Sequence, residues 1–181
     1  LDWGQARTYA IWAGGDLATE AQWEYAAKGG ENYQHAGSDS LWDFAWHEGN
    51  SSDSPKEVRL LNPNGYGLYD MSGNMNEWVL DEWHDTYDGA PSQGETPWGD
   101  IPACCPTCDK GSVDRVRRGG TFRGNVNTNL VTSRGAWPAS YRDPGQGFRI
   151  KRTVAAANGI DSPVLGGEEA CSQDGLVSCS G

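Results

Sequence analysis

The hydrophobic pattern of the first 30 residues predicts two short helices. Apolar residues recur at helical spacing at Trp3, Ala6, Tyr9, Ala10 and Ala13. Gly14-Gly15 then ends this first segment. A second helix is expected to begin near Thr19, because Thr19 and Gln22 form the Ser/Thr-x-x-Glu/Gln signature of a capping box. It should end at residues 29–30, which are both glycine.

The remaining pattern predicts short strands separated by long loops. Residues 31–66 are rich in Gly, Ser, Asn and Asp, and residues 84–112 show neither a helical nor a strand period, so both stretches are expected to be loop. Short apolar blocks indicate strands at residues 67–69, 78–83, 113–122 and 146–154, and Gly119-Gly120 interrupts the third of these. Two helices followed by scattered strands indicate an α+β fold with little regular secondary structure.

Composition and charge narrow the possible partners. The 181 residues carry a formal net charge of -11, and an acidic surface repels nucleic acid and anionic membranes. No apolar run approaches the roughly 18 residues that a membrane span requires. The sequence contains 25 glycines and 9 tryptophans, which is typical of a loop-rich fold whose core is filled by large aromatic side chains. We therefore expect a single domain with no nucleic-acid partner and no membrane span.

Five cysteines form two clusters, Cys104, Cys105 and Cys108, and then Cys171 and Cys179. Clustered cysteines in loop-like sequence favour disulfides and an oxidising compartment, so the protein is predicted to be secreted. A bridge from Cys171 to Cys179 would close a small loop, and the first cluster would supply one more bridge and leave one thiol. Cys105-Pro-Thr-Cys108 also fits a C-x-x-C redox motif, but no strand-then-helix pattern surrounds it.

Four blocks resemble the formylglycine-generating enzyme (sulfatase-modifying factor) family in order and spacing. They are Leu-Ala-Thr-Glu-Ala-Gln-Trp-Glu-Tyr-Ala-Ala at 17–27, Asn-Pro-Asn-Gly-Tyr-Gly-Leu-Tyr-Asp-Met-Ser-Gly-Asn at 62–74, Arg-Gly-Gly-Thr-Phe at 118–122 and Gly-Phe-Arg at 147–149. The resemblance implies a C-type lectin-like fold over residues 1–154, followed by a disulfide-tied tail at 155–181. Domains of this family begin with β-strands before the first helix, and we expect those strands to be missing from this sequence.

The resemblance also implies a calcium site between residues 70 and 77. Carried over, its ligands are the side chains of Asp70 and Glu77 and the backbone carbonyls of Gly73 and Met75. The chemistry agrees, because calcium takes roughly six to eight oxygen ligands from carboxylates, carbonyls and water. The sequence departs from the family at Asn76, where the family has tryptophan. That change alters packing but none of the expected ligands.

Catalysis by the family's known chemistry is not expected. The family's oxidases bind copper through two cysteines, and those positions fall on Gly124 and Asn129 here. Neither side chain supplies the soft thiolate that copper(I) prefers. A second branch of the family uses iron held by histidines of a separate helical domain. The three histidines of this chain, His35, His47 and His84, are widely spaced and show no ligand spacing.

The stretch 123–145 lies where the family's enzymes place their active groove. Its candidate ligand-binding residues are Arg123, Asn125, Asn127, Asn129, Arg134, Trp137, Tyr141 and Arg142. Such a set suits a peptide, glycan or protein ligand, although Trp137 would also suit the core and Arg134 a buried donor. We therefore expect a secreted, calcium-binding, non-catalytic binding or structural module. The alternatives are a metal-dependent oxidase of the family and a self-assembling subunit of an extracellular filament or surface layer.

Overall fold

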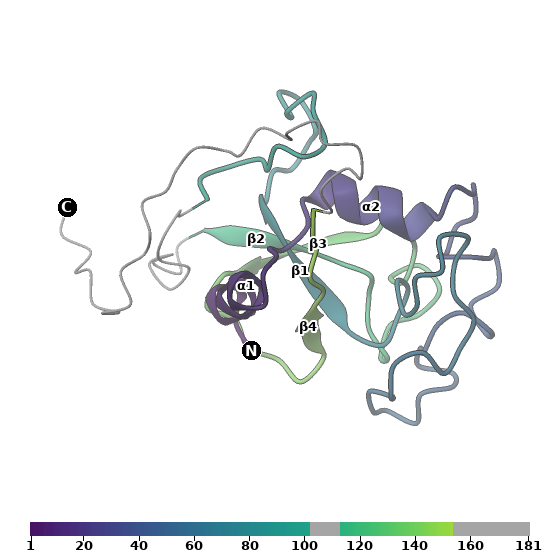
Figure 1. Ribbon diagram of the computed structural model, residues 1–181. Coiled ribbons are helices and arrows are strands. Elements are labelled where there is room, and N and C mark those ends of the chain that lie inside the picture. The colour runs from purple at the N-terminus through teal and green to yellow at the C-terminus, as the bar shows by residue number, and fades with distance from the viewer. Residues whose placement is uncertain (102–112, 154–181) are drawn as a thin grey trace.

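The fold consists of two helices and one small mixed sheet joined by long loops (Figure 1). The computed structural model describes residues 1–101 and 113–153. In this part of the chain the elements are α1 (Trp3–Trp12), α2 (Glu20–Lys28), β1 (Asn76–Glu82), β2 (Asp114–Arg118), β3 (Arg134–Pro138) and β4 (Gln146–Phe148). None of the helices in these described ranges is long and apolar enough to cross a membrane. The predicted α+β class with little regular structure is confirmed.

Both helices begin at capping boxes. Thr19 caps α2 by accepting from the N–H of Gln22, whose side chain accepts from the N–H of Thr19. Gly29 ends α2 in the left-handed conformation, with φ of 63°. Asp2 and Gln5 form an equivalent box at the start of α1, which was not predicted. Both predicted helices are confirmed, and α1 ends at Trp12 because Gly14 takes a positive φ.

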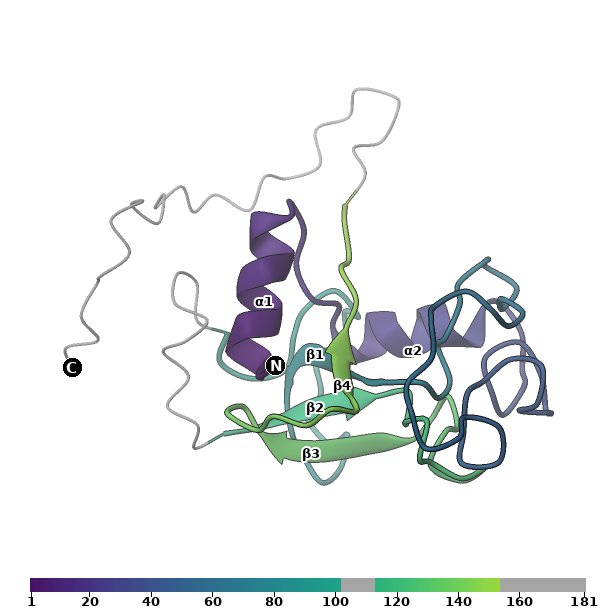
Figure 2. The same cartoon turned by 90° about the horizontal axis from the view of Figure 1, so that it is seen from below.

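The strands form one sheet in the order β3-β2-β1-β4 (Figure 2). Strand β2 pairs antiparallel with both β1 and β3, and β4 runs parallel to β1. Consecutive residues of β1 point to opposite faces of the sheet. Val79 packs with Trp23 of α2 on one face, and Trp78 packs with Trp3 of α1 on the other. The sheet therefore lies between the two helices, and each helix contributes a buried tryptophan.

The predicted strand positions are correct in part. No strand forms at 67–69, because the side chain of Asn64 accepts from the N–H groups of Tyr66 and Leu68 and holds this segment as a turn. The strand predicted at 113–122 ends at Arg118, since Gly119 and Gly120 both have positive φ. The last strand is shorter than predicted and covers only Gln146–Phe148.

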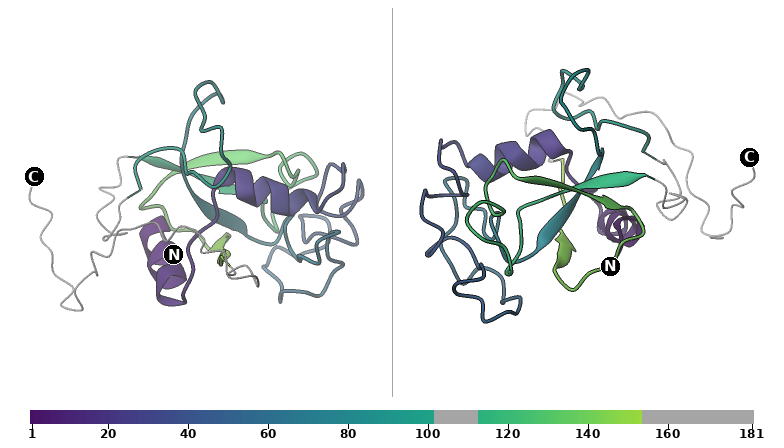
Figure 3. Two further views of the ribbon diagram at one scale, coloured as in Figure 1. Left: turned by 45° about the horizontal axis from the view of Figure 1, so that its top comes forward. Right: turned by 180° about the vertical axis from the view of Figure 1, so that it is seen from behind.

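Strand β3 was not predicted, and it lies inside the stretch expected to form a ligand-binding loop. Its sequence, Arg-Gly-Ala-Trp-Pro, lacks the alternation of β-branched and polar residues that marks a strand. Pairing with β2 holds it in place from Arg134 to Pro138. The predicted loop at 31–66 contains no helix or strand, and Figure 3 shows it gathered at the end of the molecule remote from the N-terminus.

Candidate functional site

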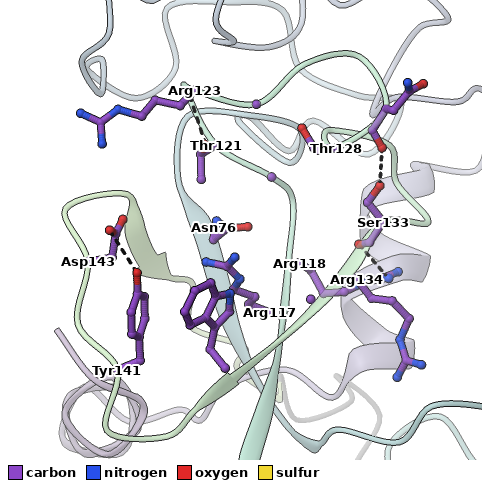
Figure 4. A pocket seen from close by; sticks show the side chains of 15 residues that line it. Asn76, Arg117, Arg118, Thr121, Arg123, Thr128, Ser133, Arg134, Tyr141 and Asp143 are labelled. Atoms are coloured by element: carbon purple, nitrogen blue, oxygen red, sulfur yellow. Dashed lines mark hydrogen bonds between the residues drawn. The ribbon is translucent and has the colours of Figure 1, made fainter.

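A groove of about 450 Å³ opens on the same face of the sheet as α1, beside the part that α1 covers (Figure 4). Asn76 of β1, Arg117 of β2 and Trp137 of β3 form its floor, since these three strands supply lining residues from one face. The loop after β2 and the loop before β4 form its walls. The remaining lining residues are Arg118, Gly120, Thr121, Arg123, Gly124, Asn127, Thr128, Ser133, Arg134, Gly135, Tyr141 and Asp143.

A stack of three side chains fills one side of the groove. The guanidinium carbon of Arg117 lies 4.6 Å from the centroid of the Trp137 ring. That ring in turn stacks on Tyr141, with centroids 4.1 Å apart. Burial lowers the pKa of Arg117, and the nearby Tyr141 and Asp143 oppose this change. The side chain nevertheless remains a guanidinium at neutral pH, because arginine is not deprotonated in proteins.

Five of the eight predicted face residues line this groove, namely Arg123, Asn127, Arg134, Trp137 and Tyr141. The other three have structural contacts. Asn125 accepts from the N–H groups of Asn127 and Thr128 and shapes its own loop. Asn129 is fully buried and accepts from the N–H of Thr121, and exposed Arg142 pairs with Asp2 at 2.7 Å.

Arg134 is held at one end of the groove by a carboxylate. Its Nε and Nη2 donate to the two oxygens of Glu20, both at 2.7 Å, and its Nη1 donates to the carbonyl of His84. Arg134 therefore acts as a largely buried hydrogen-bond donor, which was the alternative to a ligand-binding role for this residue. Arg123 lies at the rim, exposed, and pairs with Asp53 at 2.6 Å. Of the groove's arginines, Arg117 has no hydrogen bond or ion pair with any described residue.

The two positions that the resemblance aligns with the family's copper cysteines are neighbours, with Gly124 in the lining of this groove and Asn129 buried next to it. A side chain on Gly124 would place its Cβ 2.2 Å from the Oδ1 of Asn129. Asn129 uses that oxygen to hold the backbone of Thr121, at 3.1 Å. The site thus has the spatial pairing that the resemblance implied, but its two positions carry a glycine and a structural amide.

Three of the four proposed calcium ligands line a second pocket, of about 370 Å³. These are Asp70, Met75 and Glu77, whereas Gly73 is not part of the lining and its N–H donates to the carbonyl of Gly119 at 2.7 Å. Arg149, which follows β4, pairs with both oxygens of Glu77 at 2.5 and 2.6 Å. Trp23 donates to Glu77 from the opposite side at 2.7 Å.

The oxygens of this pocket fit a cation. One oxygen of Asp70 accepts from the N–H of Arg59 at 2.8 Å, while the other is buried without a partner among the described residues. Burial raises the pKa of Asp70, an effect that the Arg59 N–H and Arg149 partly offset. Each carboxylate oxygen can accept twice, so the Glu77 oxygen bonded only to Arg149 retains a lone pair. A divalent ion here would satisfy the orphaned oxygen of Asp70.

Other metal arrangements find no support in the described residues. In that part of the chain no three His, Cys, Asp or Glu side chains gather as a metal cluster. His35 bonds to the carbonyl of Asn129, His47 bonds to the N–H of Gly49, and His84 stacks on Trp98. Burial lowers the pKa of His47. The five cysteines and the predicted tail lie outside the described residues, so their predicted bridges stay predictions.

Comparison with known proteins places this geometry in a family. Over 157 residues the chain is 31% identical to the chaperone protein LppX of Paenibacillus barcinonensis, covering 76% of this chain and 49% of that protein. Over 137 residues it is 32% identical to the formylglycine-generating enzyme of Streptomyces coelicolor, covering 67% of this chain and 40% of that protein. It is also 32% identical, over 96 residues, to the inactive Cα-formylglycine-generating enzyme 2 of Bos taurus, covering 46% of this chain and 32% of that protein.

Solved structures agree with these relatives. PvdO from Pseudomonas aeruginosa superposes with a TM-score of 0.66 at 28% identity, covering 82% of this chain and 58% of that one. Treponema denticola variable protein 1 superposes with a TM-score of 0.61 at 34% identity, covering 73% of this chain and 45% of that one. The chain spans half or less of the length of the three curated relatives. The sulfatase-modifying factor enzyme 1-like domain family matches residues 1–154, and the chain belongs to that family.

Proposed function

We propose that the chain is a secreted, calcium-binding, non-catalytic binding or structural module. The observation that carries this proposal is that the two positions aligned by the resemblance with the copper cysteines hold Gly124, in the lining of the groove, and the buried Asn129. A groove that lacks the two thiolates can still bind a ligand, because binding depends on the residues that line its floor and walls. Relatives named as inactive or as a chaperone support a role other than oxidation.

Calcium would join two parts of the fold in this proposal. Asp70 belongs to the turn before β1, and Glu77 belongs to β1 itself. An ion between them would neutralise carboxylates that Arg149 alone now balances. When bound, calcium supplies charge compensation and a fixed crosslink and takes no part in chemistry. Elemental analysis of the protein purified without added metal should find stoichiometric calcium.

We expect calcium to raise the unfolding free energy of the wild-type protein by about 2.7 kcal/mol at a concentration 100 times its Kd. Asp70→Asn should lose most of this gain, because it removes the charge while keeping an oxygen for the N–H of Arg59. Asparagine also tolerates the left-handed φ of 56° at this position. Urea unfolding with calcium and with a chelator would measure the gain.

The matched control is Asp43→Asn, which removes an exposed carboxylate elsewhere and should leave the calcium gain intact. Stoichiometric copper or iron, together with turnover of a thiol-containing peptide, would overturn the non-catalytic proposal and favour an oxidase. An unfolding free energy that does not respond to calcium or chelator would refute the calcium site alone.

Secretion and disulfides form a separate part of the proposal. Five cysteines in two clusters support two bridges and one remaining thiol, and the thiol that remains would come from the first cluster. Alkylation of the unfolded, unreduced protein should therefore add one group, and alkylation after reduction should add five. Mass spectrometry reads both numbers directly. Five groups added without reduction would overturn the disulfides and, with them, the main argument for secretion.

A second candidate, a subunit of an extracellular assembly, is favoured by the sheet edges. Strands β3 and β4 lie at the two ends of the sheet, and each pairs on one side only within the described residues. An unpaired edge can accept a strand from another chain. Oligomers that survive dilution in size-exclusion chromatography would favour assembly, and a stable monomer would count against it.

A further inference from the structure

The floor of the groove contains two polar side chains that have no hydrogen-bond partner among the described residues. Arg117 makes no hydrogen bond or ion pair with any residue of the described ranges, and neither does the side-chain amide of Asn76. Figure 4 shows the two side chains next to each other at the centre of the groove. A guanidinium and an amide together offer several N–H donors in one place. Such donors are normally satisfied, so their convergence indicates a ligand that accepts hydrogen bonds.

The contrast with the neighbouring arginines identifies the charge of that ligand. Arg118, Arg134 and Arg149 are each paired with a carboxylate of the protein. Arg117 is half-buried and has no such partner in the described residues, although the chain carries a net charge of -11. Its planar group is already fixed against Trp137, which reduces the entropy lost when it binds. A planar anion such as a carboxylate matches this fork with two parallel hydrogen bonds.

A ligand can reach Arg117 across strand β3. Gly135 lies directly opposite Arg117 in the β2–β3 ladder and has no side chain to cover it. A Cβ at this position would lie 3.1 Å from the Nε of Arg117, so glycine keeps the space open. Strand β3 is an edge strand, and every other residue of an edge strand directs its N–H and C=O away from the ladder. Among the described residues, the outward carbonyl of Pro138 accepts from the N–H of Tyr141 at 2.8 Å, whereas the outward backbone groups of Arg134 and Ala136 have no partner.

These observations fit an extended polypeptide segment. A strand added along β3 would place alternate side chains on the face of the groove. The side chain beside Gly135 would then cross over the glycine toward Arg117, because cross-strand neighbours on one face lie about 5 Å apart. We propose that the groove binds an extended peptide through an Asp or Glu side chain, whose carboxylate is held by Arg117 and Asn76. This proposal rests on the binding role proposed above and specifies its ligand.

The test compares short synthetic peptides that have randomised flanks and either Glu or Gln at one fixed central position. Binding to the full chain would be measured by fluorescence polarisation at about 0.15 M ionic strength. The Glu set should bind about 10- to 100-fold more tightly than the Gln set, as expected for hydrogen bonds to a charged group. Arg117→Met should abolish this preference while keeping an apolar stem on Trp137.

Three further variants define the geometry. Arg117→Lys keeps the charge but loses the fork, so it should recover only part of the preference. Asn76→Ala should weaken the preference without abolishing it. Arg142→Met removes an exposed arginine outside the groove lining and should behave as wild type. Equal binding of the Glu and Gln sets, or an unchanged preference in Arg117→Met, would overturn the carboxylate subsite and leave a peptide-binding module without it.

N-acetyl-glutamate amide and an acidic oligosaccharide would be titrated in parallel, with the signals of Arg117 and Trp137 followed by NMR. Shifts with the glutamate compound but no binding of any peptide would overturn the peptide part of the proposal. Tighter binding of the oligosaccharide than of the Glu peptides would also overturn it and identify a glycan receptor. None of these outcomes depends on calcium, so a failure of the calcium site is separately visible in the metal analysis.

Discussion

Arg118→Met should lower the unfolding free energy by about 3–5 kcal/mol, as is typical when one partner of a buried charge pair is removed. Arg118 is fully buried and donates to the carbonyls of Val131, Thr132 and Ser133. It also pairs with Glu24 of α2. Methionine would fill much of the same volume. The loss would therefore come from unpaired polar groups rather than from a cavity.

The matched control is Arg123→Met, which removes an ion pair of similar length from the surface. Arg123 and Asp53 are 2.6 Å apart, but their side chains are 55% and 75% exposed. Exposed pairs typically contribute less than about 1 kcal/mol. Urea unfolding of both variants and the wild type, at one fixed calcium concentration, gives the comparison. Equal losses in the two variants would contradict the structural role assigned to Arg118.

The same variant should change the acid sensitivity of the protein. Burial raises the pKa of Glu24, but Lys28 and Arg118 outweigh it, so the pKa lies below its ordinary value. A carboxyl with a lowered folded-state pKa stabilises the fold above its unfolded pKa, and this stabilisation is lost as the pH falls through the folded pKa. Without Arg118, the pKa of Glu24 in the folded protein would be lowered less. The unfolding free energy of Arg118→Met should thus fall less steeply with acid than that of the wild type.

The helices were predictable because their signals are local. The Thr19 and Gln22 box and the glycine at position 29 lie within one turn of the helix ends that they define. Strand β3 was not predictable in this way, since Arg134–Pro138 becomes a strand only by pairing with β2. The sequence of β3 has low strand propensity, and long-range pairing overrides it. Likewise, the turn at 67–69 depends on Asn64, whose amide also bonds to the carbonyls of Ala26 and Ala27 in α2.

Five of the eight residues predicted for a ligand-binding face line the groove, but the residues of its floor on β1 and β2 were not predicted. The stretch 123–145 contains Trp137 and Tyr141, yet Arg117 and Asn76 lie outside it on other strands. The sequence did contain one indication that the two arginines differ in role. Alternation along a strand puts the side chains of Arg117 and Arg118 on opposite faces of the sheet. The structure has this arrangement, with Arg118 against α2 and Arg117 in the groove. Without the register of β1 and β2, however, nothing in the sequence indicated that Asn76 would lie beside Arg117.

Gly73→Ala should cost about 2–5 kcal/mol of unfolding free energy, from backbone strain of roughly 1–2 kcal/mol and overpacking of roughly 1–3 kcal/mol. Gly73 has a φ of 76°, a conformation that a residue with a side chain adopts only under strain. A Cβ here would lie 2.2 Å from the carbonyl oxygen of Trp46. That oxygen accepts the N–H of Asn74 at 2.8 Å, so the backbones of the two segments would have to separate.

Gly67→Ala is the control that isolates the close approach. Gly67 has nearly the same φ, 75°, but a Cβ at that position meets no atom within 4 Å. It should therefore cost only the strain, roughly 1–2 kcal/mol. Both variants would be unfolded in urea, with calcium and with chelator, because the carbonyl of Gly73 is also a proposed calcium ligand. A greater loss for Gly73→Ala that persists in chelator assigns it to the contact with Trp46, whereas equal losses in the two variants would contradict that contact.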